Sequence, residues 1–184
     1  LQRAQVQPYQ HAAILTMQFC IEPGKAYMLP WDHPDAKQTG RAKKRLKAQL
    51  ARLLDDPKRL VTGQNEKYDC VYTAAHTGVR YWLGGDTLMQ ATLLDENALT
   101  KGLADLTKRR LPAIAGYSDH FDATVDKSRM IEVPLNEDFL DYGCGDADAG
   151  FRLHHIQMDE ISQDKKLLAH YRYVTIPGLN AFAS

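Results

Sequence analysis

The sequence has no excess of charge of either sign: lysine plus arginine and aspartate plus glutamate number 23 each, so the formal net charge is zero. A chain-wide electrostatic attraction to nucleic acid is therefore not expected, and any contact with DNA would depend on a local basic patch. No apolar run approaches the roughly 20 residues needed to span a bilayer. The first seven residues also lack the apolar core of a signal peptide.

Cysteine is also scarce. Cys20, Cys70 and Cys144 are odd in number and widely spaced, which argues against a disulfide framework or a zinc knuckle. They are typical of reduced thiols, so we expect a cytoplasmic protein. What the sequence does have is an ordinary globular composition, 44% hydrophobic and 25% charged. Its 184 residues are enough for one domain with a core of its own.

Hydrophobic periodicity predicts strands early in the chain and mostly helices later. Strands are expected at 12–21, 26–29, 60–63 and 171–176, with a turn at 22–25 making the first two a hairpin. Helices are expected at 41–54, 66–76, 86–94, 99–111 and 137–159. Asp86 and Asn136 are the expected N-caps, and 112–133 is expected to be a long loop. This order of strands and helices along the chain predicts an α/β fold in which helices cover both faces of a mixed sheet.

A basic run marks the first of these helices. Its residues fall on the face opposite the apolar stripe. The run consists of Arg41, Lys43, Lys44, Arg45 and Lys47. We interpret it as a solvated helix face, with a DNA-binding patch as the alternative.

Tyr142 and Asp146 lie four residues apart in Tyr-Gly-Cys-Gly-Asp-Ala-Asp at 142–148, inside the last predicted helix. Side chains at this spacing share one face, with about 5–6 Å between Cβ atoms. The carboxylate could bind Mg²⁺ or Mn²⁺, which prefer oxygen ligands. The phenol could then hydrogen-bond a metal-bound water and aim it. The alternative is a half-buried core tyrosine beside an exposed carboxylate.

Asn65 and Asp69 are also four residues apart, at the start of a predicted helix. Asn65 could donate its amide to a phosphate or sugar, Asp69 could bind a second cation, and Tyr68 could offer a stacking face. The alternative is an N-capping asparagine followed by a surface turn. A divalent-metal nuclease requires carboxylates from distant segments, so the central hypothesis is that Asp69 and Asp146 share a cleft.

In this order the motifs resemble the proofreading 3′–5′ exonuclease domain of family A DNA polymerases, the bacterial DNA polymerase I type. The resemblance covers most of residues 12–158, and 112–133 match least well. The matching stretches are Phe-Cys-Ile-Glu-Pro-Gly at 19–24, Gly-Gln-Asn-Glu-Lys-Tyr-Asp at 63–69, Asp-Thr-Leu-Met at 86–89 running on to 93–97, Tyr-Gly-Cys-Gly-Asp-Ala-Asp at 142–148, and Leu-His at 153–154.

The resemblance implies an RNase H-like fold and two-metal hydrolysis, with Mg²⁺ or Mn²⁺, of the 3′-terminal phosphodiester. It implies catalytic roles for Asp69, Tyr142 and Asp146, with Asp69 and Asp146 as metal ligands. The implied contacts to a single-stranded 3′ end of DNA come from Gln64, Asn65, Tyr68 and Arg109.

The sequence departs from the family at its first motif, Asp-x-Glu on a central strand, which is absent before the strand expected at 12–21. Leu1 matches the leucine that follows this acidic pair in many relatives. We therefore expect a missing central strand, very weak metal binding, little turnover and poor folding for the 184 residues alone. Residues 1–170 are expected to form a single exonuclease-like domain, and 171–184 resemble the start of a link toward a polymerase region.

Three functions remain open from the sequence. The first is proofreading during DNA replication in a bacterial or phage-infected cell, with the 3′ end of DNA and the polymerase region of the same parent chain as partners. The second is a catalytically inactive scaffold or single-strand-binding module with the same fold. The third is an RNase D-like ribonuclease, against which the stretch at 19–24 and the polymerase-like link argue.

Overall fold

The computed structural model describes residues 13–183 and has an α/β fold, as the sequence predicts. Leu1 and the first residue of the strand expected at 12–21 lie outside this range. The strands are β1 (Thr16–Glu22), β2 (Lys25–Pro30), β3 (Leu60–Gly63) and β4 (Trp82–Asp86). The α-helices are α1 (Gly40–Leu54), α2 (Glu66–Thr77), α3 (Thr87–Leu94), α4 (Leu103–Arg110), α5 (Asp119–Thr124), α6 (Glu137–Gln163), α7 (Lys165–His170) and α8 (Ile176–Ala183). Two 3-10 segments, η2 (Pro34–Ala36) and η3 (Lys127–Glu132), and a π-helical turn, η4 (Tyr171–Thr175), complete the described elements.

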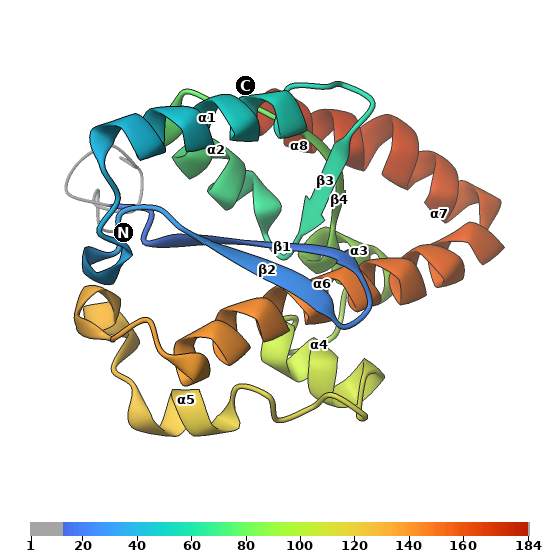
Figure 1. Cartoon of the computed structure of the whole chain (residues 1–184). Helices are drawn as coiled ribbons and strands as arrows, with labels where there is room; N and C mark the ends of the chain where they lie inside the picture. The colour runs from blue at the N-terminus through green and yellow to red at the C-terminus, as the bar shows by residue number, and fades with distance from the viewer. Residues whose placement is uncertain (1–12, 184) are drawn as a thin grey trace.

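β1 and β2 form the expected antiparallel hairpin, closed at Gly24, whose φ of +78° carries no steric cost without a Cβ. Met17 pairs with Leu29 and Gln18 with Met28. Because successive side chains on a strand point to opposite faces, these two pairs lie on opposite sides of the hairpin. The Met17 side packs in a core with α1, and the Gln18 side lies against α6. Figure 1 shows the hairpin running between these two helices.

The 27-residue helix α6 covers the other side of the hairpin at close range. A Cβ at Gly143 would lie 2.7 Å from Met28 Cε and 2.9 Å from Gln18 Nε2, so the glycine permits this approach. One turn further on, an oxygen of Asp148 accepts a hydrogen bond from the Gly24 N–H at 2.8 Å. Asp148 therefore has a structural role, since it ties the hairpin turn to α6.

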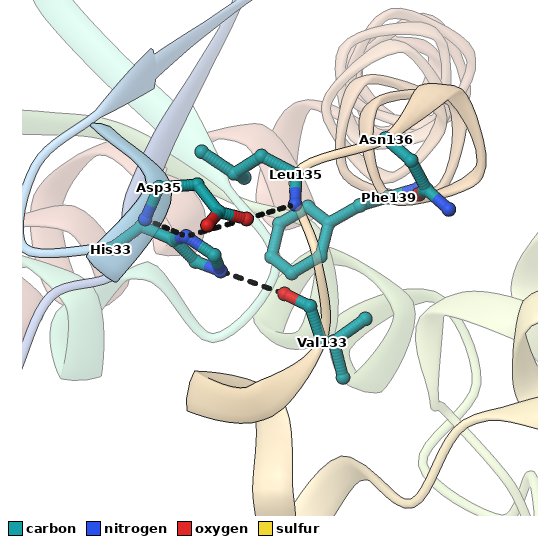
Figure 2. Close-up of polar contacts among 6 residues, drawn as sticks. All are labelled: His33, Asp35, Val133, Leu135, Asn136 and Phe139. Carbon is teal, nitrogen blue, oxygen red and sulfur yellow. Dashed lines mark hydrogen bonds and ion pairs between the residues drawn. The ribbon is translucent and has the colours of Figure 1, made fainter. Parts of the chain in front are cut away.

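The start of α6 is tied to the loop that follows the hairpin (Figure 2). His33 is 4% exposed, and its Nε2 lies 2.8 Å from the Val133 carbonyl oxygen, to which it donates. Its Nδ1 accepts from the Asp35 N–H at 3.2 Å, and Asp35 accepts from the Leu135 N–H at 3.0 Å. The imidazole also meets the edge of the Phe139 ring at a centroid distance of 5.5 Å. These contacts fix the beginning of α6 relative to the hairpin.

β3 and β4 form a parallel pair joined by α2, because parallel neighbours require a crossover connection. Leu83 of β4, 1% exposed, shares a core with Cys70 of α2 and Leu179 of α8. Helix α6 also reaches this pair, since a Cβ at Gly85 would lie 2.7 Å from the His154 ring.

The strands of residues 13–183 pair as two separate two-stranded sheets. Val61 of β3 nevertheless packs on the core that contains Met17 of β1 and Leu50 of α1. The two sheets are therefore neighbours in one hydrophobic core, although no ladder of hydrogen bonds joins them in the described residues.

The strand expected at 171–176 is wrong, because this stretch is helical, as η4 and then the start of α8. Tyr171 is 2% exposed, and its hydroxyl accepts from Gln90 Nε2 at 2.8 Å and from the Asp86 N–H at 3.3 Å. Tyr171 is therefore the one fully buried side chain of the stretch 171–176.

Three other departures from expectation are found. The loop expected at 112–133 contains α5 and η3, whose short lengths leave little periodicity to detect. Strand β4 was not expected, because its sequence Trp-Leu-Gly-Gly-Asp carries two glycines, which are depleted in strands. The helix expected at 99–111 begins only at Leu103, after Gly102. The remaining predicted elements are confirmed within a few residues.

The C-terminal helices pack on the same body as the rest of the described chain. Asn180 of α8 binds the backbone of Leu83 on both sides: its Oδ1 accepts from the N–H at 2.9 Å, and its Nδ2 donates to the carbonyl at 3.0 Å. The proposed boundary near residue 170 stays a prediction. Within 13–183, no helix has both the length and the apolar character needed to cross a membrane.

Candidate functional site

Asp146 lies half-buried on α6 and accepts a hydrogen bond from the Tyr117 hydroxyl. Burial raises the pKa of its carboxyl group, while the hydroxyls of Tyr117 and Tyr142 oppose that rise by stabilising the ionised form. Two phenols therefore converge on one carboxylate. The sequence predicted Tyr142, one helical turn before Asp146, but not Tyr117.

Neighbouring side chains hold Tyr142 in place. Its ring stacks on buried Phe121 at a centroid distance of 4.3 Å and an interplanar angle of 4°. Lys127 Nζ lies 4.6 Å from the Tyr142 ring centroid, within the range of a cation–π contact. Lys127 is itself held by Asp122 at 2.5 Å. Burial, followed by the charge of Asp146, raises the pKa of Tyr142, so the phenol stays protonated at neutral pH.

Gly145 explains how Tyr117 reaches Asp146. A Cβ at position 145 would overlap the Tyr117 ring, so glycine allows the ring to approach α6 this closely. This is the physical reason for the second glycine of the motif at 142–148. Two glycines beside an acidic residue in a helix were the available signal that something packs closely there, but its identity could not be read from the sequence.

Replacing Gly145 by alanine is expected to push Tyr117 away from Asp146 and to lower the unfolding free energy by about 1–3 kcal/mol, the usual cost of overpacking. Gly150, on the same helix, is the matched control, because a Cβ there would meet nothing within 4 Å. Gly150→Ala is expected to stabilise the chain by up to about 1 kcal/mol through helix propensity. Urea unfolding of both variants checks this, and equal shifts would contradict the close packing of Tyr117.

Asp69 lies on the first turn of α2, at the surface. Its pKa is raised to about 6, first by the partial desolvation of its surroundings and then by the charge of Asp86. Because the side chain is exposed, water screens part of this effect. Asp69 nevertheless sits in a locally negative region at the point where β3 passes into α2.

Asp86 is fully buried and accepts four backbone N–H groups. Its Oδ1 accepts from Leu88 at 3.0 Å and from Met89 and Asn65 at 3.2 Å, and its Oδ2 accepts from Glu66 at 3.0 Å. The expected cap of α3 is confirmed. The same carboxylate also serves the first amides of α2, so its oxygens are committed to the backbone rather than to a ligand.

Glu66 folds back over Gly63, where any Cβ would overlap its carboxylate. Its Oε1 accepts from the Tyr81 hydroxyl at 2.6 Å. Burial, followed by the charge of Asp69, raises the pKa of Glu66 to about 8, against the Tyr81 hydrogen bond. Glu66 is therefore mostly protonated at neutral pH. No sequence pattern marks Glu66, because its partners Gly63 and Tyr81 are not at a helical spacing from it.

Stability is expected to fall as pH rises from about 4.5 to about 8. The Glu66 carboxyl holds its proton more tightly in the folded chain than in the unfolded chain, so deprotonation across this window favours unfolding. The effect is on the order of 1–3 kcal/mol. Glu66→Gln should flatten the dependence of the melting temperature on pH, whereas exposed Glu96→Gln should leave it unchanged. A wild-type stability that rises between about pH 4.5 and pH 8 would contradict the raised pKa of Glu66.

The amides predicted to bind DNA are partly engaged within the protein. Gln64 donates from Nε2 to the Lys101 carbonyl at 2.8 Å and accepts from the Thr87 hydroxyl. Asn65 has a left-handed backbone, with φ of 57°, and its side chain makes no cap bond to α2. Its Oδ1 instead accepts from Lys67 Nζ at 2.5 Å. The alternative, in which the Asn65 side chain caps α2, is wrong, because the Asp86 carboxylate accepts from the first N–H groups of α2 instead.

Tyr68 is 48% exposed and stacks on Tyr72 at a centroid distance of 4.4 Å. Tyr72 in turn stacks on His76 at 5.8 Å, which makes a row of three rings along α2. Arg109 donates to the Thr100 carbonyl at 2.6 Å, next to the carbonyl that Gln64 binds. The structure thus gathers Gln64 and Arg109 around residues 100–101.

The predicted metal ligands fall into two groups. The polar neighbours of Asp69 are Glu66 and Asp86, and those of Asp146 are Tyr117, Tyr142 and Lys127. No residue belongs to both groups. Within residues 13–183, no three candidate ligands gather in a way that could hold a metal ion. The described donor set therefore does not by itself fit a two-ion centre.

No known family model matches the chain. It is 26% identical, over 145 residues, to the DNA polymerase of Escherichia phage T5. The match covers 70% of this chain but only 17% of that polymerase. The chain is thus similar in sequence to one part of a DNA polymerase.

Proposed function

We propose that this chain is most of the 3′–5′ exonuclease domain of a DNA polymerase and acts on the single-stranded 3′ end of DNA. The similarity to a DNA polymerase supports the part of the proposal that assigns this chain to a polymerase. The observation that carries the proposal is the group around Asp146, a carboxylate on α6 that two phenols contact. A carboxylate beside protonated phenols can hold and orient a water or a phosphate oxygen.

The proposal requires the two candidate groups to form one site. His154 packs on Gly85, the residue before Asp86, whose carboxylate binds the start of α2. Asp146 precedes His154 by two helical turns, or about 12 Å along α6. The proposal therefore requires Asp69 on α2 and Asp146 on α6 to approach each other near the β3–β4 pair.

The hydrophobic core that the two sheets share supports the RNase H-like part of the proposal. Both sheets contribute to one core, yet no ladder joins them within 13–183. The proposal requires a further strand that pairs with both β1 and β3 to form one mixed sheet. In the family that the sequence resembles, this strand carries the acidic pair that the present sequence lacks. Mg²⁺ or Mn²⁺ binding therefore requires carboxylates beyond Asp69 and Asp146.

Within this proposal, the chain's own groups bind and orient the substrate. Tyr68 offers the outer face of its ring to the terminal base, a contact that tolerates any sequence. Asn65 and Arg109 retain N–H groups for phosphate oxygens. Tyr142, fixed by Phe121, directs its hydroxyl toward the reacting end.

The test uses the protein that contains this chain, with a 5′-labelled single-stranded DNA and the same sequence as RNA. We expect stepwise shortening from the 3′ end of DNA, dependent on Mg²⁺ or Mn²⁺, with RNA shortened far more slowly. Faster cleavage of RNA would favour the RNase D-like alternative, and shortening from the 5′ end would contradict the proposal.

A non-catalytic single-strand-binding module is the second candidate, and the lack of a three-ligand group in the described residues favours it. This version predicts that the 3′ end is bound but never shortened, with or without divalent ions. Binding without shortening would therefore select it over the exonuclease.

A further inference from the structure

Although the net charge of the chain is zero, its basic and acidic residues are unevenly distributed along the sequence. Residues 37–54 contain seven lysines and arginines and no acidic residue, so the rest of the chain carries an excess of seven acidic residues. Helix α1 accounts for most of this basic segment. In Figure 1 it lies along one edge of the molecule, on the opposite side of the hairpin from α6.

Protein partners account for only part of this charge. Lys43 pairs with Asp32 and lies over the Trp31 ring, and Lys47 lies against the end of α2 at Gly78. The other four basic side chains of α1 are exposed, and no ion pair is recorded for them in the described chain. They are Arg41, Lys44, Arg45 and Arg52.

These four side chains form a stripe, because their spacings of three, four and seven or eight residues return to one helix face. The stripe is about 16 Å long, at 1.5 Å per residue. A shallow hollow of about 200 Å³ lies on it, lined by Arg45, Ala48, Gln49 and Arg52. Two of the four stripe residues, Arg45 and Arg52, therefore line the same hollow.

We propose that the exposed face of α1 binds the sugar–phosphate backbone of duplex DNA. This inference rests on the proposed function, since the duplex would be the part of the substrate that lies behind the frayed 3′ end. The stripe spans about five nucleotides of one strand at 3.4 Å each. α1 carries no aromatic residue, so it offers no platform on which unpaired bases could stack. Phosphate contacts alone suit a duplex that is held without regard to sequence.

The experiment measures binding of a labelled blunt duplex of about 20 base pairs by fluorescence anisotropy, as a function of salt. Four phosphate contacts predict a slope of log K against log salt near −3.6, and Arg41→Gln/Arg45→Gln/Arg52→Gln should bring it near −0.9. Affinity should fall roughly 100-fold at about 50 mM salt. The matched control is Lys165→Gln/Lys166→Gln/Arg172→Gln, which removes three exposed cations elsewhere and should leave slope and affinity unchanged.

Three outcomes would overturn the assignment: no duplex binding by the wild type, an equal loss in the control, or an α1 variant that keeps the duplex slope but loses binding to anionic phospholipid vesicles. A separate assay, shortening of a single-stranded 3′ end, tests the proposed exonuclease function independently of duplex binding by α1. A triple variant that still shortens single strands but binds duplex poorly supports the α1 surface. A protein that binds duplex through α1 but never shortens DNA keeps this inference and removes the exonuclease.

Discussion

Asp86→Ala is expected to lower the unfolding free energy by about 3–5 kcal/mol, because it removes the caps of two helices and leaves buried amides without acceptors. Domains of this size are stable by only about 5–15 kcal/mol. The variant should therefore lose much of its folded population on mild heating. Urea unfolding followed by far-ultraviolet circular dichroism measures the change.

Asp164→Ala is the matched control for Asp86. Asp164 caps α7 through the Lys166 and Leu167 N–H groups at 2.7 and 3.2 Å, but it is exposed and serves one helix. Its loss should cost about 1 kcal/mol. If the two variants were destabilised equally, the shared capping of α2 and α3 by Asp86 would be wrong.

Asp146→Asn, in the protein that contains this chain, is expected to slow release of the 3′ nucleotide by about 1,000-fold. Asparagine keeps an oxygen that can accept from Tyr117, but it has no negative charge. Loss of one carboxylate from a site that stabilises charge in the transition state costs several kcal/mol, and each 1.36 kcal/mol is tenfold in rate. Single-turnover shortening of a labelled strand measures the effect.

Asp148→Asn is the internal control for this experiment. Asp148 is two residues further along α6. It accepts from the Gly24 N–H of the hairpin at 2.8 Å and from Arg152 Nε, one turn along α6, at 2.9 Å. Its replacement should lower the melting temperature while leaving the rate within about twofold, as for a substitution away from the chemistry. Equal rates for wild type and Asp146→Asn would remove Asp146 from the mechanism.

Local signals made most of the fold predictable. The hairpin follows from the turn at 22–25, and the caps Asp86 and Asn136 were identified because an N-cap acts on amides two or three residues away. What the sequence could not show was the second use of Asp86. Asp86 binds the Asn65 and Glu66 amides, which are about 20 residues earlier in the sequence. No sequence pattern predicts a contact at that separation.

The candidate site was predictable to the same extent. Tyr142 and Asp146 share a face because they are one turn apart, and this geometry is fixed by the helix itself. Tyr117 and Phe121 reach them from a segment whose short helices carry no periodicity. The shared cleft of Asp69 and Asp146 depends on how α2 and α6 are placed, which is a matter of tertiary packing, and it stays a prediction.

The side-chain amide of Asn180 has a consequence for self-association. It occupies the N–H and the carbonyl of Leu83 on β4, groups that an open strand edge would offer to a second molecule. Asn180 of the C-terminal helix therefore blocks pairing of β4 with a strand of another molecule at this residue. Truncation before residue 176, or Asn180→Ala, should leave that backbone ready to recruit a strand from another copy.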